Sequence, residues 1–200
     1  MTTIEITTQS IKELREKTGV GIMECKTALS KAGGDMLMAE AIIREKCISN
    51  AAKKADRETK EGIVDAYIHN GNKIGVMIEL NCETDFVAKT EDFKNLAREL
   101  SMQIAALNPR YVSSEQVDAE ELEIQKKLYS EEAKKEGKKE EVIARIVEGK
   151  MSKYFEGRCL LEQPYMRDDS KKIKDLIKEV VGKVGENISV RRFVRYQLGT

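Results

Sequence analysis

The sequence predicts an α+β fold, and three observations carry this prediction. Apolar residues recur at helical spacing from residue 11 to residue 47, and a pattern of period two replaces that spacing between residues 63 and 82. Further amphipathic helical segments then precede a strand-like C-terminal run at residues 188–198. Because helices and strands occur in separate runs, the order favours an antiparallel sheet over a repeated strand–helix–strand unit.

Three short helices are predicted in the N-terminal part. Ser10 and Glu13 have the spacing of a capping box at the start of the first helix. Gly33 and Gly34 end the second helix, and Asp35 can cap the third. The inward positions of the second and third helices carry Cys25, Ala28, Leu29 and Ala32, followed by Ala39, Ile42, Ile43 and Cys47. We expect residues 1–48 to form a small bundle.

A linker is predicted over residues 49–61, because this segment contains alanine, asparagine, threonine and charged residues but no large apolar side chain. Its alanines also permit helix. Two alternating runs follow, at residues 63–68 and 74–82, with Asn70-Gly71 between them. Asn-Gly at this place is a strong hairpin signal, so residues 62–200 are expected to begin with a β-hairpin.

Helices dominate the rest of the predicted core domain. A helix with an apolar stripe from Phe93 to Leu107 ends at Asn108-Pro109. Two highly charged helices with narrow apolar stripes, split at Gly137, occupy about residues 118–156 and predict an antiparallel helical hairpin that projects from the domain. A short strand is expected at residues 159–161, a helix after Ser170, and a final strand at residues 188–198.

Composition excludes several classes of function. Lysine plus arginine and aspartate plus glutamate are each 35, so the formal net charge is zero and a general polyanion binder is disfavoured. The sequence contains neither an apolar run of about 18 residues nor a signal-peptide pattern, so we expect a cytoplasmic protein without membrane association. The four cysteines are scattered and there is one histidine, so neither a metal site nor a cofactor is expected.

Catalytic motifs are absent from the sequence. No phosphate-binding loop of the GxxxxGK[ST] type and no GxSxG nucleophile motif occurs. His69 lies beside the hairpin turn, where an exposed or capping role is expected rather than general-base catalysis. Glu91 and Asp92 fit the first turn of a helix, where carboxylates complement the helix dipole. The sequence therefore predicts a protein that is not an enzyme.

Two apolar residues are candidates for partner contact. Met23 has Lys26, Thr27 and Ser30 as its helical neighbours, so it lies on a polar face, close to Ile22. Phe86 allows two interpretations: it is presented on a turn if the helix begins at Thr90, or it belongs to the core if one helix runs from Thr84 through Phe93. Seven-residue spacing from Phe93 favours the core position somewhat.

Three motifs in order resemble those of the bacterial elongation factor Ts family over essentially the whole chain. They are IKELREKTGVGIMECK at residues 11–26, ELNCETDFVA at residues 79–88 and GENISVRRFVRY at residues 185–196. The resemblance implies a UBA-like three-helix domain and a core domain with an antiparallel sheet and a coiled-coil hairpin. The length is similar to that of short members with a single core repeat.

The resemblance also implies a function, namely guanine nucleotide exchange on the GTPase elongation factor Tu. In the family the tip segment enters the region of the GTPase's Mg²⁺, dislodges the ion and promotes GDP release, so that GTP can bind. The matching tip residues here are Thr84, Asp85, Phe86 and Val87. The family's N-terminal contacts match Leu14, Arg15, Ile22 and Met23. Glu83 stands where the family often has glutamine.

Two functions of other classes compete with exchange. A ubiquitin-type adaptor would use the N-terminal bundle but leaves the second motif without a purpose. A ribosome-associated RNA-binding factor would use Arg191, Arg192 and Arg195 on the last strand, although such arginines are more often solvated or paired within the protein. No direct nucleic-acid binding is expected. A homodimer is expected to be feasible, because two short chains together could match the contact area of a longer member.

Overall fold

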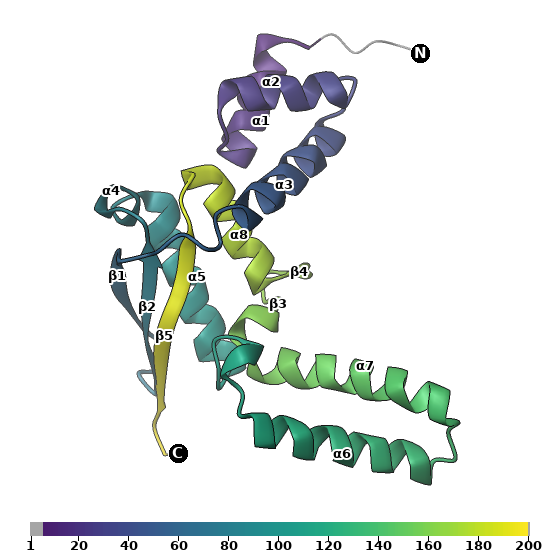
Figure 1. The fold of residues 1–200 in the computed structure, drawn as a ribbon. Helices are drawn as coiled ribbons and strands as arrows, with labels where there is room; N and C mark the ends of the chain where they lie inside the picture. Colours follow the sequence, from purple (N-terminus) through teal and green to yellow (C-terminus); the bar gives the residue numbers. More distant parts are fainter. Residues whose placement is uncertain (1–5, 200) are drawn as a thin grey trace. The chain divides into compact units, whose positions relative to one another are not determined.

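The computed structural model describes residues 6–199 and is drawn as a ribbon in Figure 1. Helices and an antiparallel sheet occur together, which confirms the α+β prediction. The chain forms two compact units, and each of them is discontinuous in sequence. The first unit contains Met1–Ile63, Leu80–Leu96 and Asp175–Ser189; the second contains Val64–Glu79, Ala97–Lys174 and Val190–Thr200. The division into residues 1–48, 49–61 and 62–200 stays a prediction.

The first unit begins with three helices, α1 (Thr8–Thr18), α2 (Ile22–Lys31) and α3 (Met36–Ala52). The first begins earlier than predicted, because the Thr7 hydroxyl accepts the backbone N–H of Ser10 and is the true cap. The Asp35 carboxylate caps α3 as expected, accepting from Met38 N at 2.9 Å. The helix α3 continues to Ala52, so the first residues of the predicted linker are helical.

Buried side chains from all three helices form one core cluster. It contains Leu14, Val20, Cys25, Ala28, Leu29, Ala32, Ala39, Ile43 and Cys47, and Ile42 packs against it. Helix α8 (Ile173–Val184) lies against α3 in the same unit, since a Cβ placed on Gly182 would come within 2.4 Å of the Cys47 side chain. A larger residue at 182 would therefore separate the two helices.

A three-stranded sheet has the order β1 (Glu61–Ile68), β2 (Ile74–Cys82) and β5 (Ile188–Gln197). The predicted hairpin joins β1 to β2: His69 N donates to Ile74 O at 2.9 Å, and Gly71 has a φ of 87°. Gly62, with a φ of 150°, is also required, because a Cβ there would lie 2.1 Å from the Leu80 carbonyl oxygen. Alternate residues of β2 are buried, from Val76 to Cys82.

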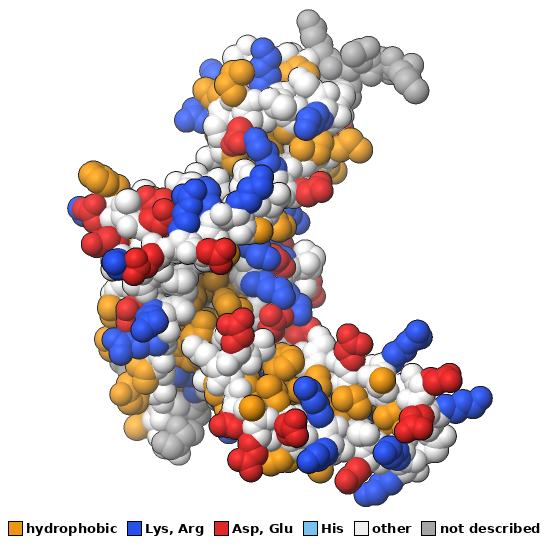
Figure 2. Space-filling model, in the orientation of Figure 1, with side chains coloured by type: hydrophobic (Ala, Val, Ile, Leu, Met, Phe, Trp, Pro, Cys, Tyr) orange, Lys and Arg blue, Asp and Glu red, His pale blue; other side chains and the backbone are white. Residues whose placement is uncertain are grey.

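The second unit contains the predicted helical hairpin, made of α6 (Ala119–Lys135) and α7 (Glu140–Arg158) (Figure 1). Gly137, with a φ of 72°, lies in the turn between them. Charged side chains of both signs cover the hairpin, as Figure 2 shows. At its base the Glu121 carboxylate accepts the Tyr111 hydroxyl at 2.9 Å and also that of Tyr154.

The segment after the hairpin differs from prediction. Residues 159–161 do not form a strand: a 3-10 turn covers Leu160–Glu162, and Cys159 makes a single bridge to Tyr111. A small two-stranded sheet follows, β3 (Pro164–Tyr165) with β4 (Asp168–Lys172). Ser170 lies in β4, and α8 begins only at Ile173. The reason is that pairing with β3 holds these polar residues extended, which the local pattern did not indicate.

Candidate functional site

The second motif ends in a short turn at residues 84–88, between β2 and α5 (Glu91–Leu107), which we call the tip. Its helix, α4, contains only Asp85–Ala88. The Thr84 side chain caps α4 by accepting Val87 N–H at 3.4 Å. The Thr90 hydroxyl then donates to Val87 O at 2.7 Å and accepts Phe93 N–H at 3.4 Å, so a separate helix begins after it.

Phe86 projects from the tip and is 79% exposed, whereas Phe93 is completely buried. The core interpretation of Phe86, which the seven-residue spacing favoured, is therefore wrong. The cause is the second helix start at Thr90, because the interruption changes the helical phase between the two rings. The alternative prediction of a presented Phe86 is confirmed.

The other end of the tip is anchored in the protein. Val87 and Ala88 are 8% and 5% exposed, so both side chains anchor the tip, and a contact of Val87 with a partner stays a prediction. The Cys82 thiol donates to Thr84 O at 3.1 Å. Burial, with the nearby Glu186 charge, raises the pKa of Cys82 to about 11, so the thiol stays protonated and keeps this hydrogen bond at neutral pH.

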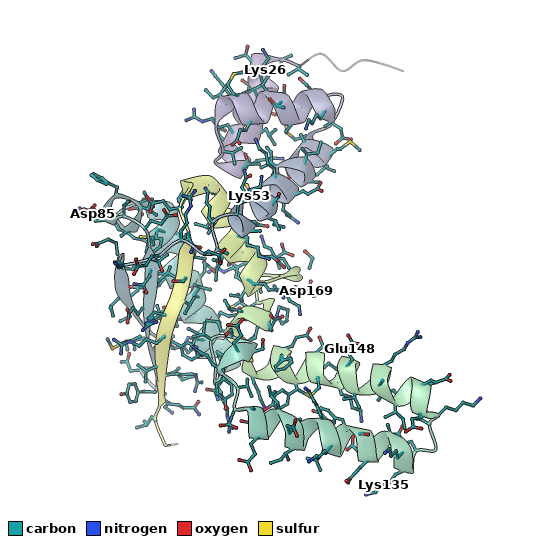
Figure 3. The ribbon with its side chains drawn as sticks, viewed as in Figure 1. Lys26, Lys53, Asp85, Lys135, Glu148 and Asp169 are labelled. Carbon is teal, nitrogen blue, oxygen red and sulfur yellow. The ribbon has the colours of Figure 1, made fainter. Side chains whose placement is uncertain are left out.

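Asp85 is the charged residue of the tip, and Figure 3 labels it on α4. Its carboxylate accepts from Lys89 Nζ at 2.6 Å, with half of the Asp85 side chain exposed. The hydrogen bond from Lys89 lowers the pKa of Asp85 below its usual value. Asp85 is ionised at neutral pH, and Lys89, its side-chain partner among the described residues, is itself exposed.

A second group of predicted contact residues belongs to α1 and α2. Ile22 and Met23, at the start of α2, are 53% and 71% exposed, and Arg15 on α1 is also exposed. Leu14 is completely buried among the three helices, and its contact with a partner stays a prediction. It supports the bundle from inside.

Exposed apolar residues that the sequence analysis missed occur at the start of α3. Leu37 is 76% exposed and Met38 is 56% exposed. Both lie off the buried stripe of α3, which runs through Ala39 and Ile43. Their position off that stripe is the signal that could have identified them before the structure.

Comparison with known proteins adds an independent observation. The family model described as "Elongation factor TS" matches residues 23–200. The elongation factor Ts of Thermodesulfovibrio yellowstonii is 56% identical over 194 residues, covering 97% of this chain and 96% of that protein. The protein of the same name from Thermoanaerobacter sp. (strain X514) is 54% identical over 194 residues, covering 97% and 95%. That from Fervidobacterium nodosum is 51% identical over 196 residues, covering 98% and 100%.

The chain belongs to the elongation factor Ts family. It is accordingly a translation elongation factor, and the resemblance drawn from the three motifs is confirmed. Its tip and its N-terminal surface carry the residues that matched the family's contact motifs, apart from the buried Leu14 and Val87.

The outer face of the sheet in this family member is also apolar, which the sequence analysis did not recognise. A shallow depression of about 260 Å³ lies there, with Val64 and Met77 among its lining residues. The exposed side chains could have been identified as alternate positions of β1, β2 and β5 that are not buried. They are Val64, Ile68, Met77, Val194 and Tyr196.

Two of the three arginines considered for RNA binding are engaged within the second unit. Arg192 Nε donates to the Glu79 carboxylate at 2.7 Å. Arg195 donates from Nε and Nη2 to the carbonyl oxygen of Ala105 at 3.2 and 3.1 Å. Arg191 is exposed. A guanidinium that is already paired has fewer N–H donors left for a phosphate, which disfavours the RNA-binding hypothesis.

Within residues 6–199, no group of three or more histidine, cysteine, aspartate or glutamate side chains is arranged to hold a metal ion. No helix in that same range combines the length and the apolar character that crossing a membrane needs.

Proposed function

We propose that this protein is a guanine nucleotide exchange factor for elongation factor Tu and that it acts in the cytoplasm. The observation that carries the proposal is Phe86, an aromatic ring 79% exposed on a capped, four-residue helix. A ring held out in this way can enter a partner without any rearrangement of the tip. The resemblance of residues 79–88 to the family's second motif directs it to the metal–nucleotide site of the GTPase.

The physical basis of exchange is the way a GTPase holds GDP. Its phosphates are bound by backbone N–H groups, a lysine and Mg²⁺. Phe86 enters between elements of the partner that carry these groups and displaces them, while the ionised Asp85 disturbs the polar network around Mg²⁺. When the ion leaves, the phosphates lose their main countercharge and GDP is released, so that GTP can bind.

Linkage sets how much binding energy this requires. A factor that weakens GDP binding must bind the nucleotide-free GTPase more tightly than the GDP-bound form by the same ratio. A ~1,000-fold effect corresponds to about 4 kcal/mol of differential contact. No covalent bond forms or breaks in this process, so the proposed activity is not enzymatic and needs no cofactor.

The N-terminal bundle supplies the second contact with the GTPase. Arg15, Ile22 and Met23 offer one charged and two apolar side chains for its nucleotide-binding domain. An adaptor function would use this surface alone and would leave the exposed Phe86 without a role. The exchange hypothesis uses both surfaces and is therefore preferred.

A homodimer is the further partner that we propose, with the outer face of the sheet as its contact. The exposed apolar residues of that face lie on all three strands of the sheet, so two copies could cover them by packing face to face. A single core repeat per chain would then be doubled by association.

The experiment is a stopped-flow measurement of fluorescent GDP leaving purified elongation factor Tu. We expect saturating amounts of this protein to accelerate release strongly, and release at the spontaneous rate would refute the function. Asp85→Ala should slow release at saturation more than it weakens complex formation. Equal losses in both quantities would contradict the role assigned to Asp85.

A further inference from the structure

The loop between α8 and β5 grips the tip through a carboxylate. Glu186 accepts two hydrogen bonds from one residue: Thr84 N donates to Oε2 at 2.9 Å, and Thr84 Oγ1 donates to Oε1 at 2.7 Å. Hydrogen bonds to an ionised acceptor are roughly twice as strong as neutral ones, and the paired geometry fixes the direction of the backbone. Glu186 therefore holds the residue that caps α4.

The next residue of the loop makes the reciprocal connection. Asn187 N donates to Glu83 Oε1 at 2.7 Å, and Glu83 also faces Arg57 at 3.5 Å. The Asn187 side-chain amide donates to the carbonyl oxygens of Ala55 and Arg57, at 3.1 and 2.8 Å. Three separate segments of the first unit thus meet at residues 186 and 187.

The same loop is joined to the end of the three-helix region. Lys54 Nζ donates to the Gly185 carbonyl oxygen at 2.6 Å. Residues 185–187 consequently bind both the tip, which carries Phe86, and the segment that leads from α3. We call this set of contacts the clasp; its members are Lys54, Ala55, Arg57, Glu83, Thr84, Gly185, Glu186 and Asn187.

A helix as short as α4 needs such external support. Isolated helices shorter than about 12 residues are marginal in water, and α4 contains only Asp85–Ala88. Val87 and Ala88 anchor its far end by burial. The beginning of α4, which carries Phe86, is held by the hydrogen bonds that Thr84 donates to Glu186. A tip ordered before binding avoids the entropy cost of being ordered by the partner.

We propose that Glu186 and Asn187 are positioning residues for nucleotide exchange: through the clasp they hold the tip in its binding conformation. This inference rests on the proposed exchange function. It also gives residues 185–187 of the third motif a role unrelated to RNA. Glu83, at the position where the family often has glutamine, adds a charge to the clasp. A glutamine could still accept Asn187 N–H but would lose the charge that faces Arg57.

The principal test is Glu186→Gln in the full-length protein. The amide loses the charge and has one acceptor oxygen for the two Thr84 donors, so the Thr84 hydroxyl must accept from its NH₂ instead of donating. We expect the GDP-release rate at saturation to fall about tenfold, which is about 1.4 kcal/mol. The concentration for half-maximal rate should change less than twofold. Glu91→Gln, which removes an exposed charge at the start of α5, is the matched control and should keep the wild-type rate.

Amide hydrogen exchange of the free protein provides a readout that does not depend on the GTPase. In Glu186→Gln we expect the hydrogen-bonded amides of Thr84, Val87 and Ala88 to exchange about tenfold faster, with the buried amides of α5 unchanged. Wild-type protection at the tip would overturn the inference. If wild-type protein fails to accelerate GDP release while the tip amides still respond, the exchange function fails and the clasp stands.

A further variant keeps the test decisive if Glu186→Gln does not fold. Asn187→Ala releases the Ala55 and Arg57 carbonyls and should slow release at saturation severalfold. A folded Asn187→Ala protein with wild-type release and tip protection would refute the positioning role.

Discussion

Replacing Phe86 by alanine separates a contact residue from a core residue, and Phe93 provides the matched control. Phe86 is 79% exposed, so its removal leaves no internal cavity. Exposed substitutions change the free energy of unfolding by about 0.5 kcal/mol or less. Phe93 is completely buried, and truncating such a ring costs about 3–5 kcal/mol. At about 2–4 °C per kcal/mol for a chain of this size, Tm should fall by less than about 2 °C for Phe86→Ala and by about 6–20 °C for Phe93→Ala.

The effect of Phe86→Ala on nucleotide exchange follows from the area that the ring can bury. A phenylalanine side chain buries about 200 Å², of which the 79% exposed part is about 160 Å². At about 25 cal/mol per Å², full burial in the GTPase contributes about 4 kcal/mol. A free energy of about 1.4 kcal/mol corresponds to a factor of ten. Losing the full 4 kcal/mol therefore slows the accelerated release about 1,000-fold, and losing about a third of it slows the release about tenfold.

The assay pairs thermal unfolding by circular dichroism with stopped-flow GDP release from elongation factor Tu. Phe86→Ala should be normal in the first measurement and defective in the second. A fall in Tm comparable to that of Phe93→Ala would indicate that Phe86 is a core residue. Normal release by a folded Phe86→Ala protein would remove the ring from the exchange mechanism.

Three other predictions address other parts of the molecule. Met23→Glu should leave Tm unchanged and weaken binding to nucleotide-free GTPase at least fivefold in titration calorimetry; unchanged affinity would exclude Met23 from the contact. Val64→Lys should reduce the molar mass seen by light scattering at high concentration, whereas a monomeric wild type would refute the sheet-face dimer. Burial, aided by the hydrogen bond to Glu121, raises the pKa of Tyr154 to about 12. The folded state then favours the neutral phenol, so the free energy of unfolding should fall between pH 10 and 12, and Tyr154→Phe should reduce that fall in denaturant titrations.

Local sequence was sufficient for most elements of this fold. Asn70-Gly71 predicted the hairpin and Asp35 the cap of α3, because turn chemistry and helix capping act within a few residues. Charge-laced stripes split at Gly137 predicted the helical hairpin for the same reason. The strand at Ser170 was missed because its pairing with β3 depends on a neighbouring segment rather than on its own pattern.

The candidate site depended more on tertiary structure. Helical periodicity could not decide between a buried and a presented Phe86, since seven-residue spacing has no meaning across an interrupted helix. Leu14 and Val87 stand in the family motifs beside exposed residues, and only packing shows that they are buried.

By itself, the sequence determined the α+β class, the positions of the hairpin and helices, and the motifs that place the chain in the elongation factor Ts family. Tertiary structure alone decided which motif residues face solvent and what holds the tip in place. Thr84 and Glu186 are 102 positions apart, and their hydrogen bonds form only when the ends of β2 and α8 are brought together. Such a contact leaves no periodic or local pattern in the sequence, because it joins residues that are distant in the chain and meet only after folding.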